Sequence, residues 1–355
     1  MPSNNIVRDI HVLVQNKLLP SVPSRWNKQL SFGLQAYGLH AFQSVAGNAR
    51  MTVANSRTAV RKSERLFQNS KLSDQLGIVS DSLNLVRPSS FVNVDHSDVN
   101  QLTALVGAVQ TRNGRAIPCF VETTYAPRIP GFGSQRSTPR TNQLRRAMDA
   151  ARKMQSFTGH TIDALQDFAD RLGFWPKLVF DRGFGNESIV THLAAEGATF
   201  YIRLKAGRFV EFDEQRVEVK QLKDKDACVQ LFGMALRVIR SPKSRRAKEP
   251  WYILTNDMAG SRNKVVKVYY HRFEIEESFK DMKHIFELKR TRLNKPSSLK
   301  LLLWFVSLGM ALLYIVTKPT KQQRNHTHPK KRTSWLRQAY EQLQQAYGLL
   351  AWGEG

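Results

Sequence analysis

The sequence predicts an α/β or α+β fold built on a mixed sheet. Three observations support this: β-rich runs alternate with helical periodicity between residues 89 and 205, a hairpin signal lies at residues 111–114, and 41% of the 355 residues are hydrophobic. A chain of this length and composition can bury a sizeable core and form two or three domains. The predicted order of elements, β-β-β-α-β-α-β, is typical of a sheet covered by helices.

The elements of this core follow one another along the chain. Strands are predicted over 90–95, 102–110 and 115–125, a helix over 143–172, a strand over 177–180, a helix over 187–196 and a strand over 199–205. The first strand (SFVNVD) is expected to end on Asp95, and the short strand KLVF ends just before Asp181. The turn TRNG joins the second strand to the third.

Other segments surround this core. The predicted parts are a helical N-terminal DNA-binding region over 1–85, a catalytic core over 86–205 and 258–317, a β-rich insertion over 206–257, and a basic linker with an amphipathic C-terminal helix over 318–355. The N-terminal region carries Arg57, Arg61, Lys62 and Arg65 at helical spacing, which suits either contact with DNA or a solvated helix face. The C-terminal helix has one apolar stripe, suited to docking on the body of the chain or on a second subunit.

The charge balance points to the class of partner. The chain has 54 Lys and Arg against 29 Asp and Glu, a net charge of +25, so nucleic acid is the first expected partner and a membrane surface the second. Only Cys119 and Cys228 occur, in no CxxC spacing, so neither a disulfide framework nor a zinc site is expected. The N-terminus shows no signal-peptide pattern, and a cytoplasmic, nucleoid-associated protein is expected.

One apolar segment has two interpretations. Residues 301–316 (LLLWFVSLGMALLYIV) contain no charge, but they are shorter than the roughly 20 residues that span a bilayer. We therefore expect a buried core helix and no membrane association.

Four polar residues near residue 275 share a helical spacing. On one continuous helix Tyr269, Arg272, Glu276 and Lys283 would lie within an arc of about 60°. One face would then present a hydroxyl, a guanidinium, a carboxylate and an ammonium group.

Three acidic residues are candidates for a metal site. Asp95 and Asp181 each follow a predicted strand, and if those strands are parallel neighbours, the two carboxylates lie close together. A divalent cation relieves the repulsion of such a pair, and Glu276 could add a third carboxylate. Alternatives stay open, since a strand-terminal Asp also forms turns and helix caps, and Asp98 competes with Asp95 for the first position.

These residues resemble a known family. The spacing of Tyr269, Arg272, Glu276 and Lys283 resembles the Y-R-E-K signature of bacterial transposases of the insertion-sequence-four type, which belong to the DDE class with a ribonuclease H-like core. The segments DRGFGN and VNVDHSD resemble the family's surroundings of its second and first catalytic Asp. The resemblance covers about residues 89–290, and Phe273 departs from it, since some relatives carry Trp there.

The resemblance implies roles for these residues. Asp95, Asp181 and Glu276 would bind two Mg²⁺ ions, with Mn²⁺ able to substitute, for two-metal phosphoryl transfer. Contacts with DNA would come from Tyr269, Arg272, Lys283, Trp251, Arg203 and Lys205, with Trp251 stacking on an extruded base. The expected partners are double-stranded DNA, at the transposon ends and the target, and a second copy of the chain in a homodimer.

The expected function is that of a DNA transposase that nicks and joins strands at the ends of its element. Two alternatives stay open: a catalytically inactive DNA-binding regulator, and a ribonuclease H-like nuclease without strand transfer.

Overall fold

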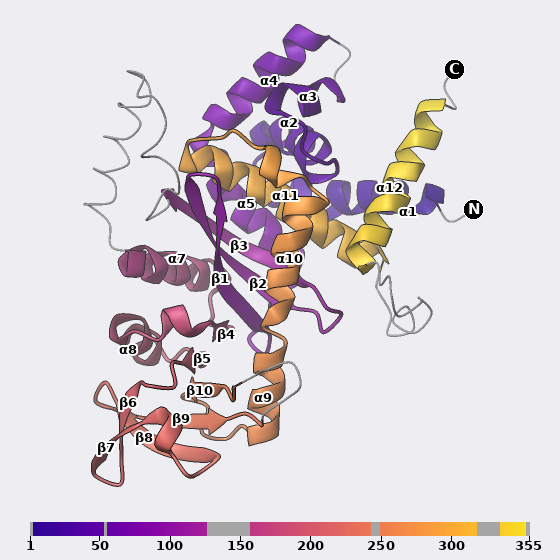
Figure 1. The fold of residues 1–355 in the computed structure, drawn as a ribbon. Coiled ribbons are helices and arrows are strands. Elements are labelled where there is room, and N and C mark those ends of the chain that lie inside the picture. The colour runs from indigo at the N-terminus through magenta and orange to yellow at the C-terminus, as the bar shows by residue number, and fades with distance from the viewer. Residues whose placement is uncertain (1–2, 53–54, 126–156, 243–248, 318–333, 353–355) are drawn as a thin grey trace, which may run out of the picture.

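The computed structural model describes residues 3–52, 55–125, 157–242, 249–317 and 334–352 (Figure 1). Its strands are β1 (Phe91–Val99), β2 (Leu102–Gln110), β3 (Ala116–Tyr125), β4 (Lys177–Phe180), β5 (Phe200–Leu204), β6 (Phe209–Phe212), β7 (Gln215–Glu218), β8 (Asp226–Leu231), β9 (Met234–Arg240) and β10 (Tyr252–Thr255). Its α-helices are α1 (Ser3–Leu13), α2 (Ser24–Gly33), α3 (Val45–Arg50), α4 (Ser56–Gln68), α5 (Ser70–Ser82), α7 (Phe157–Leu172), α8 (Glu187–Ala195), α9 (Arg262–Tyr270), α10 (Phe273–His284), α11 (Pro296–Thr317) and α12 (Trp335–Trp352).

All ten of these strands belong to one mixed sheet, in the order β3-β2-β1-β4-β5-β10-β9-β8-β6-β7. The β1, β2 and β3 strands form an antiparallel meander, while β4 runs parallel to both β1 and β5. The predicted fold class is confirmed: a mixed sheet is flanked by helices at both ends of the chain, consistent with a ribonuclease H-like core. The hairpin turn predicted between β2 and β3 is also present, with Gly114 in the left-handed region at φ +85.

Residues 206–257 extend this sheet. Strands β6 to β9 lie beyond β10, and β10 pairs antiparallel with β5, so the predicted insertion continues the core sheet at one edge. The boundary at residue 206 stays a prediction. Of the helix predicted over 143–172, the structure describes α7, and residues 143–156 lie outside the described residues, as does the basic linker over 318–333.

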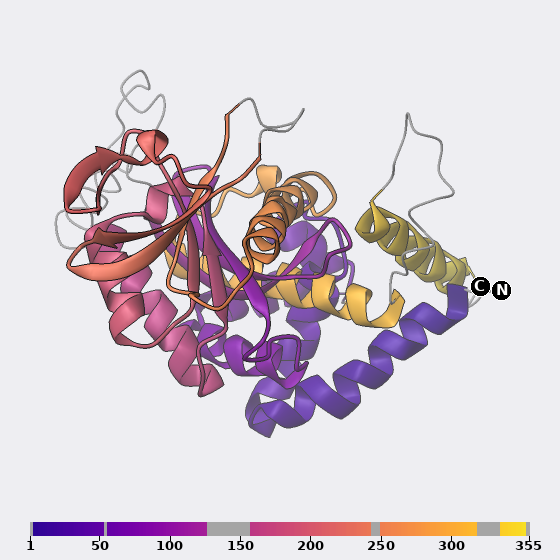
Figure 2. The same cartoon turned by 90° about the horizontal axis from the view of Figure 1, so that it is seen from below.

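Helices cover both faces of the sheet (Figure 2). Alternate side chains of β1 point to opposite faces. Asn93 and Asp95 point toward α9 and α10, where Asn93 donates a hydrogen bond to the His271 carbonyl at 3.0 Å. His96 points the other way and stacks between Phe157 of α7 and Phe184. The site described below therefore lies on the α10 face.

The apolar segment predicted as a core helix forms α11, which packs against β3, α5 and the N-terminal helices. By length and composition it could cross a membrane, but 78% of its most apolar window is buried inside the protein. Gly309 of α11 lies so close to Gly38 that a Cβ there would be 1.8 Å from the Gly38 carbonyl oxygen. These observations support the core helix.

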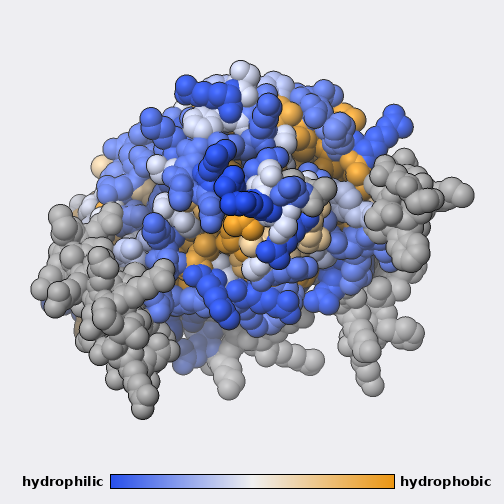
Figure 3. Space-filling model, turned by 90° about the horizontal axis from the view of Figure 1, so that it is seen from above, coloured by the Kyte–Doolittle hydropathy of each residue, from blue (hydrophilic) through white to orange (hydrophobic). Residues whose placement is uncertain are grey.

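The N-terminal helices lie at one end of the sheet, where α3 and α4 form the top of the molecule in Figure 1. Seen from that side the surface is largely hydrophilic, with a small apolar patch near its centre (Figure 3). The four basic residues predicted at helical spacing all lie on α4.

The C-terminal helix α12 docks on the body of its own chain. Its apolar stripe is buried, with Leu336 and Leu343 fully covered, and the Tyr340 hydroxyl accepts a hydrogen bond from the Ala41 amide at 2.6 Å. The sequence predicted that this stripe docks on the body of the chain or on a second subunit, and in the structure it docks on the body of the chain.

Candidate functional site

Two aspartates lie side by side where β4 ends. The parallel register of β1 and β4 runs to the pair Val94 and Phe180, so Asp95 and Asp181 occupy the next step on neighbouring strands. The sequence analysis expected the two aspartates to lie close together if these strands were parallel neighbours, and they are. The expectation that the first strand ends at Asp95 is wrong. Pairing with β2 carries β1 on to Val99, past the end of β4.

The predicted single helix is also wrong, because the chain forms α9 and α10 with a break between them. At the break the Gln110 side chain donates a hydrogen bond to the Val268 carbonyl, as Asn93 does to that of His271. A continuous helix would bond those carbonyls to the amides of Arg272 and Ile275. These amides instead bond three residues back, to Tyr269 and Arg272. Side chains of β1 and β2 thus stabilise the break.

Arg272 lies at the break and holds two of the candidate carboxylates. Its Nη1 is 3.3 Å from Asp95 Oδ2, and its Nη2 is 2.5 Å from Glu276 Oε1. Since the terminal nitrogens of a guanidinium are about 2.3 Å apart, these two carboxylate oxygens lie within about 8 Å of each other. Asp181 is close enough to both Asp95 and Arg272 to raise their pKa values. The Arg272 guanidinium therefore contacts two of the candidate carboxylates, and the third, Asp181, lies near them without a direct contact to it.

The electrostatics of Asp95 follow from this crowding. Burial raises the pKa of Asp95 to about 6, the Arg272 guanidinium opposes that rise, and Asp181 and Glu276 add to it. A carboxyl group in this state is protonated easily unless a further cation arrives. Asp98 lies elsewhere: it is exposed and accepts a hydrogen bond from the Thr103 hydroxyl at 2.6 Å.

The three carboxylates suit a hard divalent cation, because their donor atoms are all oxygens. As the side chains stand, no three His, Cys, Asp or Glu residues in the described part of the chain converge closely enough to hold a metal. The Arg272 guanidinium contacts an oxygen of Asp95 and an oxygen of Glu276.

Aromatic rings surround Arg272. Its Cζ lies 5.8 Å from the centre of the Tyr269 ring and 4.8 Å from that of Phe273. Trp251, just before β10, contacts both rings at 5.4 and 5.6 Å between centroids. Tyr269 is buried, and its hydroxyl has no hydrogen-bond partner of good geometry among the described residues, nor does Arg272 Nε.

The other predicted DNA contacts lie around these rings. Arg203 belongs to β5 and is close enough to Tyr269 to lower the pKa of its hydroxyl. Lys205 follows β5 and is exposed. Lys283 is half-buried in the last turn of α10. The pKa of its ammonium group is lowered, chiefly by burial; the charge of Asp98 opposes this effect and that of Lys289 adds to it.

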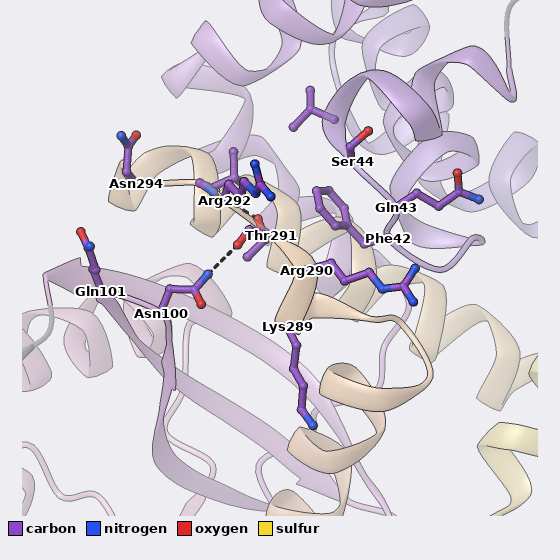
Figure 4. A pocket seen from close by; sticks show the side chains of 12 residues that line it. Phe42, Gln43, Ser44, Asn100, Gln101, Lys289, Arg290, Thr291, Arg292 and Asn294 are labelled. Carbon is purple, nitrogen blue, oxygen red and sulfur yellow. Dashed lines mark hydrogen bonds between the residues drawn. The ribbon is translucent and has the colours of Figure 1, made fainter. Parts of the chain in front are cut away.

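A basic groove lies beyond Lys283, and the sequence analysis did not identify it (Figure 4). Its volume is about 1020 Å³, and it lies between the start of α3, the β1–β2 turn and the segment after α10. Its lining comprises residues 42–45, 100–101 and 289–294, and its polar side chains include Gln43, Ser44, Asn100, Gln101, Lys289, Arg290, Arg292 and Asn294. Its wall is fixed by a hydrogen bond from the Asn100 side chain to the Thr291 carbonyl at 2.5 Å. The basic run LKRTR at 288–292 was its only signal in the sequence.

The chain matches one family. Residues 158–313 match the family model described as the transposase DDE domain. The matched segment contains Asp181, Arg272 and Glu276, begins after Asp95, and covers less than half of the chain. The comparison with curated proteins gives no match. A transposase DDE domain indicates DNA binding and divalent metal ions in DNA recombination, and the match supports a DDE transposase.

Proposed function

We propose that the protein is a DNA transposase of the insertion-sequence-four type that nicks the ends of its own element and joins them to target DNA. The observation that carries this proposal is the meeting of Asp95, Asp181 and Glu276 around Arg272, within a chain that matches the transposase DDE domain. Asp95 is the better first carboxylate than Asp98, since it faces α10 and contacts Arg272.

The three carboxylates would hold two Mg²⁺ ions, or Mn²⁺ in their place. Bound there, the ions would activate the attacking oxygen and stabilise the leaving oxygen of a phosphoryl transfer. The chain's own part is to fix the carboxylates on rigid elements: Asp95 on β1, Asp181 directly after the paired strand β4, and Glu276 in the first turn of α10. Such placement limits how far the carboxylates would have to move when metal ions bind.

The DNA strand would run along α10, from the carboxylates toward the basic groove. Glu276 and Lys283 are seven residues apart on one face of this helix, about 10 Å along its axis. Lys283 would contact a phosphate as a point charge, and the arginines of the groove would do so as forks. Trp251, half-buried beside Tyr269 and Phe273, offers a ring on which a base could stack.

The amides of the basic groove suggest base contacts as well. Gln43, Gln101 and Asn294 carry donors and acceptors that pair with base edges, and Asn or Gln binds adenine with two hydrogen bonds. The groove would therefore both hold phosphates and read bases near the cleaved bond. A homodimer in the DNA complex belongs to this proposal, since two ends must be joined in concert.

The test uses purified protein, a supercoiled plasmid that carries one end of the element, and Asp181→Asn as the variant. The wild type should nick the plasmid at the end only when Mg²⁺ or Mn²⁺ is present, and should join a precut end to a second plasmid. Asp181→Asn should bind the end with unchanged affinity and give no nicks. Nicking by this variant at the wild-type rate would overturn the proposal, and nicking without joining would favour a nuclease without strand transfer.

A further inference from the structure

Arg272 is a charged side chain in an unusual position. It is only 3% exposed, and the guanidinium touches Asp95 and Glu276 while Asp181 lies near enough to raise its pKa. Two carboxylates thus contact one cation, and a third lies nearby. A buried charge is tolerated when it is paired and hydrogen-bonded, so this guanidinium and these carboxylates stabilise one another.

The pairing leaves parts of both sides unsatisfied. Arg272 Nε has no hydrogen-bond partner among the described residues, and aromatic rings of Tyr269 and Phe273 cover the guanidinium. One positive charge also leaves an excess of two negative charges if all three carboxylates are ionised. More positive charge near the carboxylates, or an anion near Arg272, would therefore lower the electrostatic energy of this cluster.

Arg272 and a divalent cation would compete for the same atoms. Mg²⁺ binds carboxylate oxygens at about 2.0–2.1 Å and needs near-octahedral geometry. Asp95 Oδ2 and Glu276 Oε1 both point at the guanidinium, at 3.3 and 2.5 Å. A cation coordinated by both oxygens would lie between them, where the two terminal nitrogens now lie, and would also repel them.

We propose that Arg272 is the internal counter-ion of the metal-free enzyme, and that it must release Asp95 and Glu276 before divalent ions bind there. The proposal rests on the proposed function, because it takes the three carboxylates as the metal ligands. The released guanidinium is then free to form a forked contact with a DNA phosphate. The exchange replaces one set of ion pairs by another, so no charge in the site is left without a partner.

This exchange couples the binding of metal to the binding of DNA. When a DNA phosphate binds Arg272, the carboxylates become available to a metal ion. When a metal ion binds the carboxylates, Arg272 becomes available to a phosphate. Such a coupling is reciprocal and typically amounts to a factor of 5 to about 150. Free protein would thus bind metal weakly, which would limit cutting at sites where no DNA phosphate has reached Arg272.

The test measures Mn²⁺ binding to the free protein, without DNA, by titration with detection of unbound Mn²⁺. Arg272→Gln should bind Mn²⁺ about tenfold more tightly than the wild type, the size of an ordinary coupling between two sites. The titration is done at about pH 8, because removal of the arginine raises the pKa of Asp95 further and a higher pH favours the ionised carboxylate. Arg272→Lys keeps one charge but cannot bridge two carboxylates, and it should give a smaller increase.

Arg115→Gln is the matched control. Arg115 also bridges two carboxylates of α10, with Nε 2.5 Å from Asp281 and Nη2 3.5 Å from Glu277, but it lies outside the site. Its loss should leave Mn²⁺ affinity unchanged. Thermal unfolding shows that each variant is folded, and Arg272→Lys decides the question if Arg272→Gln does not fold.

The outcomes separate this proposal from the proposed function. Affinity in the folded Arg272 variants equal to or weaker than that of the wild type would overturn the role of Arg272 alone, provided that Asp181→Asn abolishes binding. Undiminished binding by Asp181→Asn would show that the ion lies elsewhere and would overturn the carboxylate site, and the proposed function with it.

Discussion

Two of the glutamates on helix α10, Glu274 and Glu276, lie two residues apart but differ in burial and in their partners. Glu274 is 5% exposed and accepts hydrogen bonds from the backbone amides of Thr111, Arg112 and Gly114, at 3.1 to 3.2 Å. The Glu276 side chain is 41% exposed, and its one ion-pair partner among the described residues is Arg272. The Glu274 carboxylate is satisfied by backbone donors, whereas Glu276 shares its one cation with Asp95.

The same difference separates two faces of the helix. Glu274, Ser278 and Asp281 form a hairpin face, where each contacts the β2–β3 turn: Ser278 bonds the backbone of Ala116, and Asp281 pairs with Arg115. Glu276 and Lys283 form a site face. Polar groups of the hairpin face are satisfied inside the protein, and this stabilises the fold. The polar groups of the site face, Glu276 and Lys283, have fewer partners within the protein and are therefore able to bind a ligand.

The largest expected effect comes from exchanging the two glutamates separately for glutamine. Glu276→Gln should abolish Mg²⁺-dependent nicking while the unfolding temperature and DNA affinity stay close to those of the wild type. Glu274→Gln should lose about 1–3 kcal/mol of stability, because its amide replaces one of the two acceptor oxygens by an NH2 donor, which would face at least one of the three backbone N–H groups. A plasmid nicking assay and thermal unfolding of both variants measure the contrast. Equal loss of stability in the two would contradict the assignment of the faces.

A smaller effect is expected from Asp95→Asn, and its sign is opposite to that of Glu274→Gln. The pKa of Asp95 is about 6 in the folded protein against an ordinary value of 3.8, so the folded state binds the proton more tightly. Ionisation therefore costs stability as the pH rises through 6, by about 1–3 kcal/mol. Asp95→Asn should be more stable than the wild type at pH values above about 7, and the difference should vanish below about pH 4.

Denaturant unfolding of the two proteins across this pH range measures the difference. The comparison with the wild type is needed because burial also raises the pKa of Asp81 to about 6, and both proteins share that group. A variant less stable than the wild type at neutral pH would show that the ionised carboxylate of Asp95 is stabilising, as that of Glu274 is expected to be.

The sheet and the aspartate pair could be predicted because their signals are local. Apolar runs mark β1 to β5, and the position directly after a strand places Asp181 at the edge of the sheet without further information. To predict that Asp95 lies near Asp181, one tertiary contact must also be known, the parallel pairing of β1 with β4.

The features that the sequence did not predict depend on contacts between distant segments. The break between α9 and α10 is made by Gln110 and Asn93, which lie about 160 and 180 residues away from the carbonyls they bond. Helical periodicity continues through the break, because each half is itself an amphipathic helix. The basic groove likewise joins residues 43–45, 100–101 and 289–294, and no short window of sequence contains them all.

The smallest expected effect compares two lysines of α10, three residues apart. Lys283 lies on the site face, half-buried, while Lys280 is exposed and pairs with Glu277 at 2.5 Å. Lys283→Gln should weaken binding of a 20-base-pair duplex and reduce the slope of log affinity against log salt by about one, the value for one lost phosphate contact. Lys280→Gln should change the slope less, because the exposed Lys280 ammonium group is already paired with Glu277. Fluorescence anisotropy over a series of salt concentrations measures both slopes. Equal slopes for the two variants would place the DNA away from the site face, and the path from Glu276 to the basic groove would then be wrong even if the carboxylates bind metal.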